Sequence, residues 1–137
     1  EAGIGADFDR LCGDSLVRVR RVGHTDVPEQ YMAAADILAL PSYRESFGLT
    51  VIEAAACGVP AVASRVYGLT DAIDENLTGL LHAPGDVAGI ESALERLMAD
   101  PDLRSRMGAA ARERALRDFS MERISGELLA FYGRILG

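Results

Sequence analysis

The 137-residue sequence has few cysteines, few aromatic residues and a shortage of positive charge. Its two cysteines, Cys12 and Cys57, do not form a C-x-x-C pair, so we expect reduced thiols and a cytoplasmic protein. Lysine and arginine together number 14 against 21 acidic residues, which gives a net charge of −7. A surface that replaces the counterions around nucleic-acid phosphates needs a basic stripe, so this balance argues against RNA or DNA binding.

Long hydrophobic runs are also missing, so we expect neither a membrane-spanning helix nor a secretion signal. The start at Glu1 without a methionine suggests a cut chain, and the last helical pattern, which runs up to Gly137, suggests a natural end. Apolar residues make up 49% of the chain, enough for one core, and 14 glycines with frequent alanine favour closely packed α/β layers.

Short apolar runs alternate with helical patterns along the chain. Strands are predicted at 16–22, 37–40, 61–63 and 79–82, and helices at 7–11, 28–35, 49–57, 69–73 and 87–98, with further helices after Asp100 and Ser120. The last helix has the apolar pattern of an element that covers a larger body. The alternation predicts a Rossmann-like α/β domain, a parallel sheet with helices on both faces, whose ligands bind at the carboxyl ends of the strands.

The loop 41–48 follows one predicted strand and leads into the helix 49–57, so it lies at that edge of the sheet. The first turn of a helix has unpaired N–H groups and a positive dipole end, which suit a diphosphate, and Gly48 allows close approach to the backbone. Glu45 precedes this turn, and Glu53 follows Gly48 by roughly 7 to 8 Å along the helix axis. Because a carboxylate accepts two hydrogen bonds, it suits adjacent sugar hydroxyls. The loop therefore predicts a nucleotide-sugar site.

A second interpretation is that Glu53 lies on the solvent face of the helix and Glu45 is an ordinary loop acid. The apolar residues beside Glu53, namely Val51 and the alanines at 54–56, make a freely solvated face less expected. An unpaired buried carboxylate costs several kcal/mol or shifts its pKa, which favours a carboxylate that faces a ligand.

The segment ESFG at 45–48, with Glu53 eight positions after Glu45, resembles the E-x7-E signature of retaining family 4 glycosyltransferases, which have the two-domain GT-B fold. The stretches 31–64, 68–86 and 100–120 resemble the nucleotide-sugar-binding half of that fold. The resemblance implies that residues 1–137 are a single partial Rossmann-like domain, the C-terminal half of a GT-B fold truncated at its N-terminus. The resemblance also implies that the N-terminal acceptor-binding domain is absent from this chain.

The resemblance also implies the roles of the site residues. Glu45 is expected to be the catalytic residue that contacts the donor sugar and Glu53 to bind the ribose, while Phe47, Gly48, Leu49 and Thr50 hold the sugar and diphosphate through their backbone. The expected donor is a UDP- or GDP-linked hexose, transferred with retention and without a metal or other cofactor. Catalysis would then rest on orienting the donor and stabilising the leaving diphosphate.

Ser46 replaces the usual glycine of the signature, and the segment YGLTDAI at 67–73 replaces the more usual Gly-Gly-x-x-Glu. The second departure resembles enzymes of capsule, exopolysaccharide and lipopolysaccharide synthesis. This implies transfer to a lipid-linked or saccharide acceptor, in the cytoplasm or peripherally at the inner face of the cell membrane. The alternatives are a GT-B-like epimerase or phosphorylase, and a non-catalytic structural or binding module.

Two further expectations concern metal binding and assembly. Asp100 and Asp102 match the D-x-D form of metal-dependent glycosyltransferases, but an N-cap before Pro101 and an acid in the first helical turn explain both residues. Loss of the upstream strands should leave a sheet edge or an apolar face uncovered, so we expect self-association of this chain.

Overall fold

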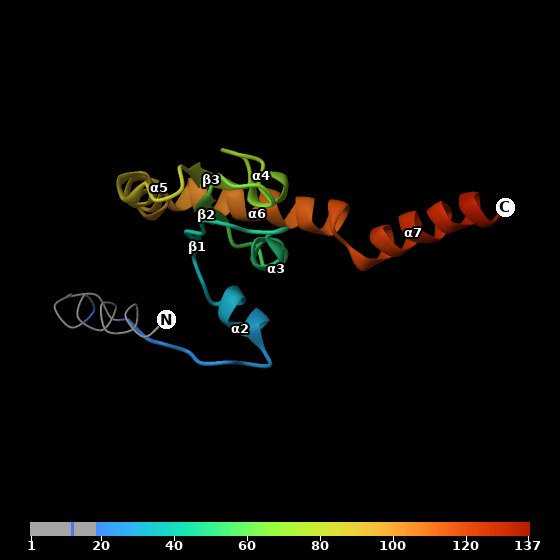
Figure 1. Cartoon of the computed structure of the whole chain (residues 1–137). Coiled ribbons are helices and arrows are strands. Elements are labelled where there is room, and N and C mark those ends of the chain that lie inside the picture. The colour runs from blue at the N-terminus through green and yellow to red at the C-terminus, as the bar shows by residue number, and fades with distance from the viewer. Residues whose placement is uncertain (1–11, 13–18) are drawn as a thin grey trace.

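The computed structural model describes Cys12 and residues 19–137, and its centre is a parallel sheet with strand order β1-β2-β3 (Figure 1). In the register, Leu38 of β1 pairs with Ala61 of β2, which pairs with Gly79 of β3. The strands are β1 (Leu38–Leu40), β2 (Ala61–Ser64) and β3 (Gly79–His82). The helices are α2 (Pro28–Ala33), α3 (Leu49–Ala56), α4 (Leu69–Ala72), α5 (Val87–Ala99), α6 (Pro101–Asp118) and α7 (Met121–Leu136).

Both faces of the sheet are covered, which confirms the predicted α/β architecture. On one face Ala61 and Ala63 of β2 pack in a cluster with Val51 of α3 and Leu69 of α4. On the other face the intervening Val62 packs with Leu80 of β3, Leu97 of α5 and Met107 of α6. Successive side chains of a strand point to opposite faces, so a strand that is apolar at every position is buried on both sides.

Small residues bring α6 close to α3. Ala55 of α3 forms a buried cluster with Ala111 and Ala115 of α6. At Gly108 the two backbones nearly touch, because a Cβ placed there would lie 2.1 Å from the carbonyl oxygen of Gly58. Gly58 has a φ of +80° and directly follows the C-cap of α3. The glycines at 58 and 108 therefore set the distance between the two helices.

Helices α5, α6 and α7 begin at the N-cap residues that the sequence predicts. A side-chain oxygen of Asp86 accepts the amide of Gly89 at 2.9 Å, and one of Asp100 accepts the amide of Leu103 at 2.8 Å. Ser120 accepts the amide of Arg123 at 3.4 Å. Each bond satisfies one of the N–H groups that the first turn of a helix leaves unpaired.

The strand predicted at 16–22 is wrong over 19–22, the part of it that the structure describes. Residues 19–22 are exposed and lie outside any strand, because no neighbouring strand in the described part of the chain pairs with them. A strand needs the hydrogen bonds of a partner, which alternation of side chains alone does not provide. Residues 16–18 of this prediction, and the predicted helix 7–11, lie outside the described residues.

The last helix also differs from expectation. α7 extends away from the sheet and the other helices (Figure 1), and none of its residues is buried. Leu129 and Leu136 remain 72% and 82% exposed. The prediction that this helix covers a larger body therefore does not hold in the part of the chain that the structure describes. None of the helices in that part is long and apolar enough to cross a membrane.

Candidate functional site

The loops that follow the three strands meet at the carboxyl edge of the sheet. Gly68, in the loop after β2, lies against the loop after β1, since a Cβ on it would be 2.7 Å from the carbonyl group of Ser46. Gly85, in the loop after β3, lies against Tyr43, whose hydroxyl oxygen would be 3.5 Å from such a Cβ. The loop 41–48 thus lies between two neighbouring loops at the edge where parallel sheets bind their ligands.

Helix α3 begins at this edge without a side-chain cap. Its N-cap, Gly48, has a left-handed backbone with φ +73° and ψ +39°, and it accepts the amides of Val51 and Ile52 at 2.9 and 3.2 Å. Within the described residues, the structure places no acceptor on the amides of Leu49 and Thr50. Two unpaired N–H groups at the positive end of a helix form a site for an anion.

Glu53 lies on the same side of α3 as these two residues. Residues three and four apart are neighbours on a helix surface, so Glu53 follows Leu49 and Thr50 along one face, and all three are exposed. The expectation that apolar residues leave Glu53 no freely solvated face is wrong, because Val51 and Ala54 are buried whereas Glu53 is exposed. In the described chain Glu53 has no ion-pair partner, so its carboxylate is available.

Glu45 is half-buried at the other end of the turn. One of its carboxylate oxygens accepts the amide of the next residue, Ser46, at 3.1 Å. No cation of the described residues pairs with it. The structure therefore brings Glu45, Phe47 and Gly48 together in the turn before α3, with an acidic side chain before the free amides and another, Glu53, beyond them.

Phe47 connects this turn to the far end of α6, a contact that the sequence did not reveal. Its ring, 46% exposed, meets the ring of Phe119 edge-to-face with centroids 6.0 Å apart. The guanidinium carbon of Arg114 lies 5.3 Å from the centroid of Phe119. Nothing in the local spacing links residues 47 and 119, so only the folded chain shows that Arg114 and Phe119 border the site.

The acidic and histidine residues with metal-ligating side chains are scattered in the structure. In the described part of the chain, no three histidine, cysteine, aspartate or glutamate residues are grouped so that they could hold a metal ion. Asp100 of the D-x-D segment caps α6. His24 is exposed beside Asp26 at 3.7 Å, and His82 is buried with its Nδ1 2.8 Å from the carbonyl oxygen of Ala83.

The fold and this edge define a Rossmann-like α/β domain whose α3 begins with two unpaired amides, between two carboxylates that have no ion-pair partner in the described chain. The family model described as glycosyl transferases group 1 matches residues 13–114. The chain belongs to this family, and its fold matches part of the fold of GT-B glycosyltransferases.

Individual relatives agree with this assignment. The D-inositol 3-phosphate glycosyltransferase of Saccharomonospora viridis is 44% identical over 110 residues, which are 80% of this chain and 25% of that protein. Sucrose-phosphate synthase from Thermosynechococcus elongatus superposes with a TM-score of 0.82 at 34% identity, over 97% of this chain and 33% of that one. An Anabaena protein solved with UDP-glucose superposes with a TM-score of 0.86 at 25% identity, over 97% of this chain and 36% of that one. The chain thus spans about a quarter to a third of the length of these relatives.

Proposed function

We propose that this chain is the donor-binding part of a retaining hexosyltransferase that uses a nucleoside-diphosphate sugar. The observation that carries the proposal is the start of α3, where the unpaired amides of Leu49 and Thr50 follow the carboxylate of Glu45 and precede that of Glu53, neither of which has an ion-pair partner in the described chain. The family match supports it, as do the Anabaena structures, which contain UDP and UDP-glucose. UDP is therefore the first nucleotide to test, with GDP as the alternative.

Each group has a separate part in binding the donor. The amides of Leu49 and Thr50 receive the diphosphate, and Gly48, which lacks a side chain, lets the ligand reach the backbone. Glu53 accepts hydrogen bonds from the ribose hydroxyls. Glu45 and the backbone of Phe47 hold the donor hexose, with Glu45 as the residue that touches the reacting sugar.

The chemical step follows from this placement. When the bond between the anomeric carbon and the diphosphate oxygen breaks, negative charge develops on the leaving diphosphate. N–H groups already aimed at that oxygen stabilise the charge without having to reorient, which lowers the barrier. The carboxylates fix the ribose and the hexose, so the anomeric carbon stays oriented toward the acceptor. We infer that no metal is needed for this step and that the sugar is transferred with retention.

The rest of the enzyme would supply the acceptor. We infer a lipid-linked or saccharide acceptor in cell-surface polysaccharide synthesis, bound by an N-terminal domain, in the cytoplasm or at the inner face of the membrane. This chain alone would bind the donor without turnover. Its exposed α7 and the edge strand β1 also support self-association, which light scattering would test, and a monodisperse monomer would contradict it.

Calorimetric titration of UDP, GDP and UDP-glucose into this chain tests the donor site. Glu53→Ala should weaken UDP binding about tenfold or more, because a hydrogen bond to a charged group contributes about 1.5 to 3 kcal/mol. Glu45→Ala should weaken UDP-glucose binding and leave UDP binding nearly unchanged. Glu91→Ala, which removes an exposed carboxylate from α5, controls for the change in net charge.

Two results would contradict the assigned roles. Equal losses for Glu45→Ala and Glu53→Ala with both ligands would show that the carboxylates do not separate hexose from ribose. No binding of any nucleotide at millimolar concentration would favour the non-catalytic module. With the full-length enzyme, release of free nucleoside diphosphate would distinguish a transferase from an epimerase or a phosphorylase.

A further inference from the structure

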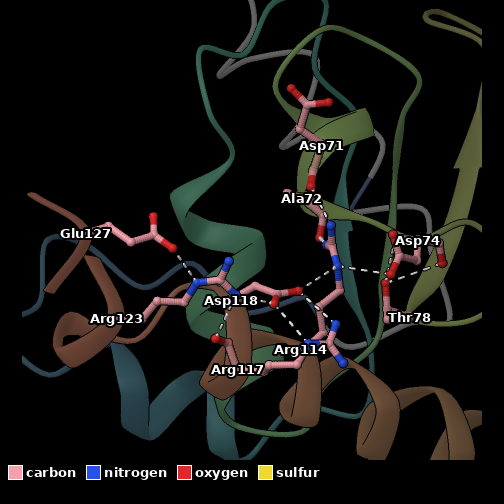
Figure 2. A network of polar contacts seen from close by, with 9 residues as sticks. All are labelled: Asp71, Ala72, Asp74, Thr78, Arg114, Arg117, Asp118, Arg123 and Glu127. Carbon is pink, nitrogen blue, oxygen red and sulfur yellow. Dashed lines mark hydrogen bonds and ion pairs between the residues drawn. The ribbon is translucent and has the colours of Figure 1, made fainter. Parts of the chain in front are cut away.

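Arg114 of α6 anchors the C-terminal end of α4. Its guanidinium donates to the backbone carbonyl oxygens of Ala72 and of Asp71, the latter at 2.7 Å, and its Nε lies 3.0 Å from the carboxylate of Asp74 (Figure 2). The side chain is 15% exposed. A planar guanidinium has several donors in a fixed arrangement, so it holds these groups at one relative position, which a lysine ammonium cannot do.

Helix α4 in turn supports Gly48. A Cβ on Gly48 would lie 2.8 Å from a terminal methyl carbon of Leu69, the first residue of α4, and 3.5 Å from the Cβ of Ala72. The backbone of Gly48 therefore rests directly on the helix that Arg114 holds. A displacement of α4 would be transmitted to the start of α3 without any contact between Arg114 and a ligand.

A second route from Arg114 reaches Phe47. The guanidinium packs on the ring of Phe119, whose edge-to-face contact with Phe47 fixes the residue next to Gly48. Phe119 is the C-cap residue of α6, and its neighbour Asp118 is paired with Arg117 and with Arg123 of α7, each at 2.8 Å (Figure 2). The pair with Arg123 joins the two helices that meet at Phe119 and so restricts its position.

We infer that Arg114 and Phe119 are positioning residues of the donor site. They hold Phe47 and Gly48 from two sides, and so orient the amides of Leu49 and Thr50 without touching the ligand. This inference rests on the proposed function for its consequence in binding. The support of the turn itself is a property of this chain and can be tested without a nucleotide.

Hydrogen exchange of the backbone amides tests that support. The amides of Val51 and Ile52 donate to the carbonyl oxygen of Gly48 at 2.9 and 3.2 Å, so their exchange reports on this turn. Phe119→Ala should speed exchange at residues 51 and 52, and Phe119→Leu, which keeps most of the apolar volume, should have a smaller effect in a chain that stays folded. A second variant, Arg114→Met, removes the guanidinium that holds α4, and its matched control is Arg112→Met. Arg112 lies on the same helix and also donates to a helix-end carbonyl, that of Ala56 at 2.6 Å, but it contacts the other end of α3.

The control should leave exchange at residues 51 and 52 unchanged, whereas Arg114→Met should raise it. Unchanged exchange at these two residues in both Phe119 variants would overturn the inference, whatever the chain binds. If the unmodified chain binds no nucleotide while exchange rises as expected, the proposed function fails and the support of the turn stands.

UDP titration of a double-mutant cycle tests the link to binding. Phe119→Ala should weaken UDP binding about tenfold, since small misplacements of binding groups have effects up to a hundredfold. If Phe119 acts through Phe47, the loss of UDP affinity caused by Phe119→Ala should largely disappear in a Phe47→Ala background. The effects of two substitutions that remove the same contact are not additive. Full additivity, or equal UDP affinity of Phe119→Ala and the unmodified chain, would overturn the inference.

Discussion

Replacing Gly108 by alanine should destabilise the protein, although alanine is the better helix former. The added Cβ would lie 2.1 Å from the carbonyl oxygen of Gly58, 3.1 Å from its carbonyl carbon and 3.4 Å from the Cδ of Pro60. Carbon and carbonyl oxygen normally meet at about 3.3 Å, so α6 and the end of α3 must separate by roughly 1 Å. The obstacle is backbone, so no side-chain rotation relieves the contact.

The magnitude follows from two opposing effects. Alanine gains about 1 kcal/mol over glycine inside a helix, and overpacking of a well-filled interior costs about 1 to 3 kcal/mol. Because backbone blocks the added carbon and the cluster of Ala55, Ala111 and Ala115 is pulled apart with it, we expect the upper end of the cost. The free energy of unfolding should therefore fall by about 2 kcal/mol.

Urea unfolding followed by circular dichroism measures this change. With a typical slope of about 2 kcal/mol per molar, the midpoint should drop by about 1 M. Gly126→Ala in α7 is the matched control, because no atom lies within 4 Å of its added Cβ. A midpoint for Gly108→Ala at or above that of the unmodified chain would show that α6 and α3 do not need this close approach.

Two further predictions concern the site and its surroundings. Gly48→Ala should lower the free energy of unfolding by about 1 to 2 kcal/mol, because φ is +73° there, and it should also weaken UDP binding. Gly23→Ala, with open space around it, should change neither. If the two variants gave the same urea midpoint and the same UDP affinity, this prediction would be contradicted. The hydrogen bond from Arg117, followed by the attraction of nearby arginines, holds the pKa of Asp118 below its usual value. The ionised Asp118 therefore stabilises the folded chain at neutral pH, and this stabilisation is lost as the pH falls through the lowered pKa. Asp118→Asn should therefore unfold at lower urea than the unmodified chain at pH 7, and the difference should close as the pH falls below about 4; a difference that persists in acid would refute the ion-pair explanation.

Elements with strong local signals were predicted correctly from the sequence. Strand β3 matches its predicted range, and α5 and α6 begin at the aspartates predicted to cap them. A cap is a bond between residues three apart, so the sequence contains all of its atoms. The alternation at 16–22 failed over 19–22 for the opposite reason, because a strand depends on a partner elsewhere in the chain.

The candidate site likewise has features that could be predicted from the sequence and one that could not. The turn at Gly48 and the acids at 45 and 53 could be identified from spacing, and the family match agrees with the signature they form. The exposure of Glu53 does not follow from its neighbours in the sequence, because Val51 and Ala54 are buried on other sides of the helix. The assignment of Glu45 to the hexose and Glu53 to the ribose stays a prediction.

The sequence by itself determined the order of the strands and helices from α2 to α7, the caps, and the spacing of the two carboxylates about the turn before α3, because these depend on bonds and periodicities within a few residues. Tertiary structure alone decided that Phe119 and Arg114 border a turn some 70 residues earlier, that the glycines at 58 and 108 nearly touch, and that α7 is left uncovered. These features arise from packing between distant segments, and no local pattern encodes which distant segment a side chain will meet.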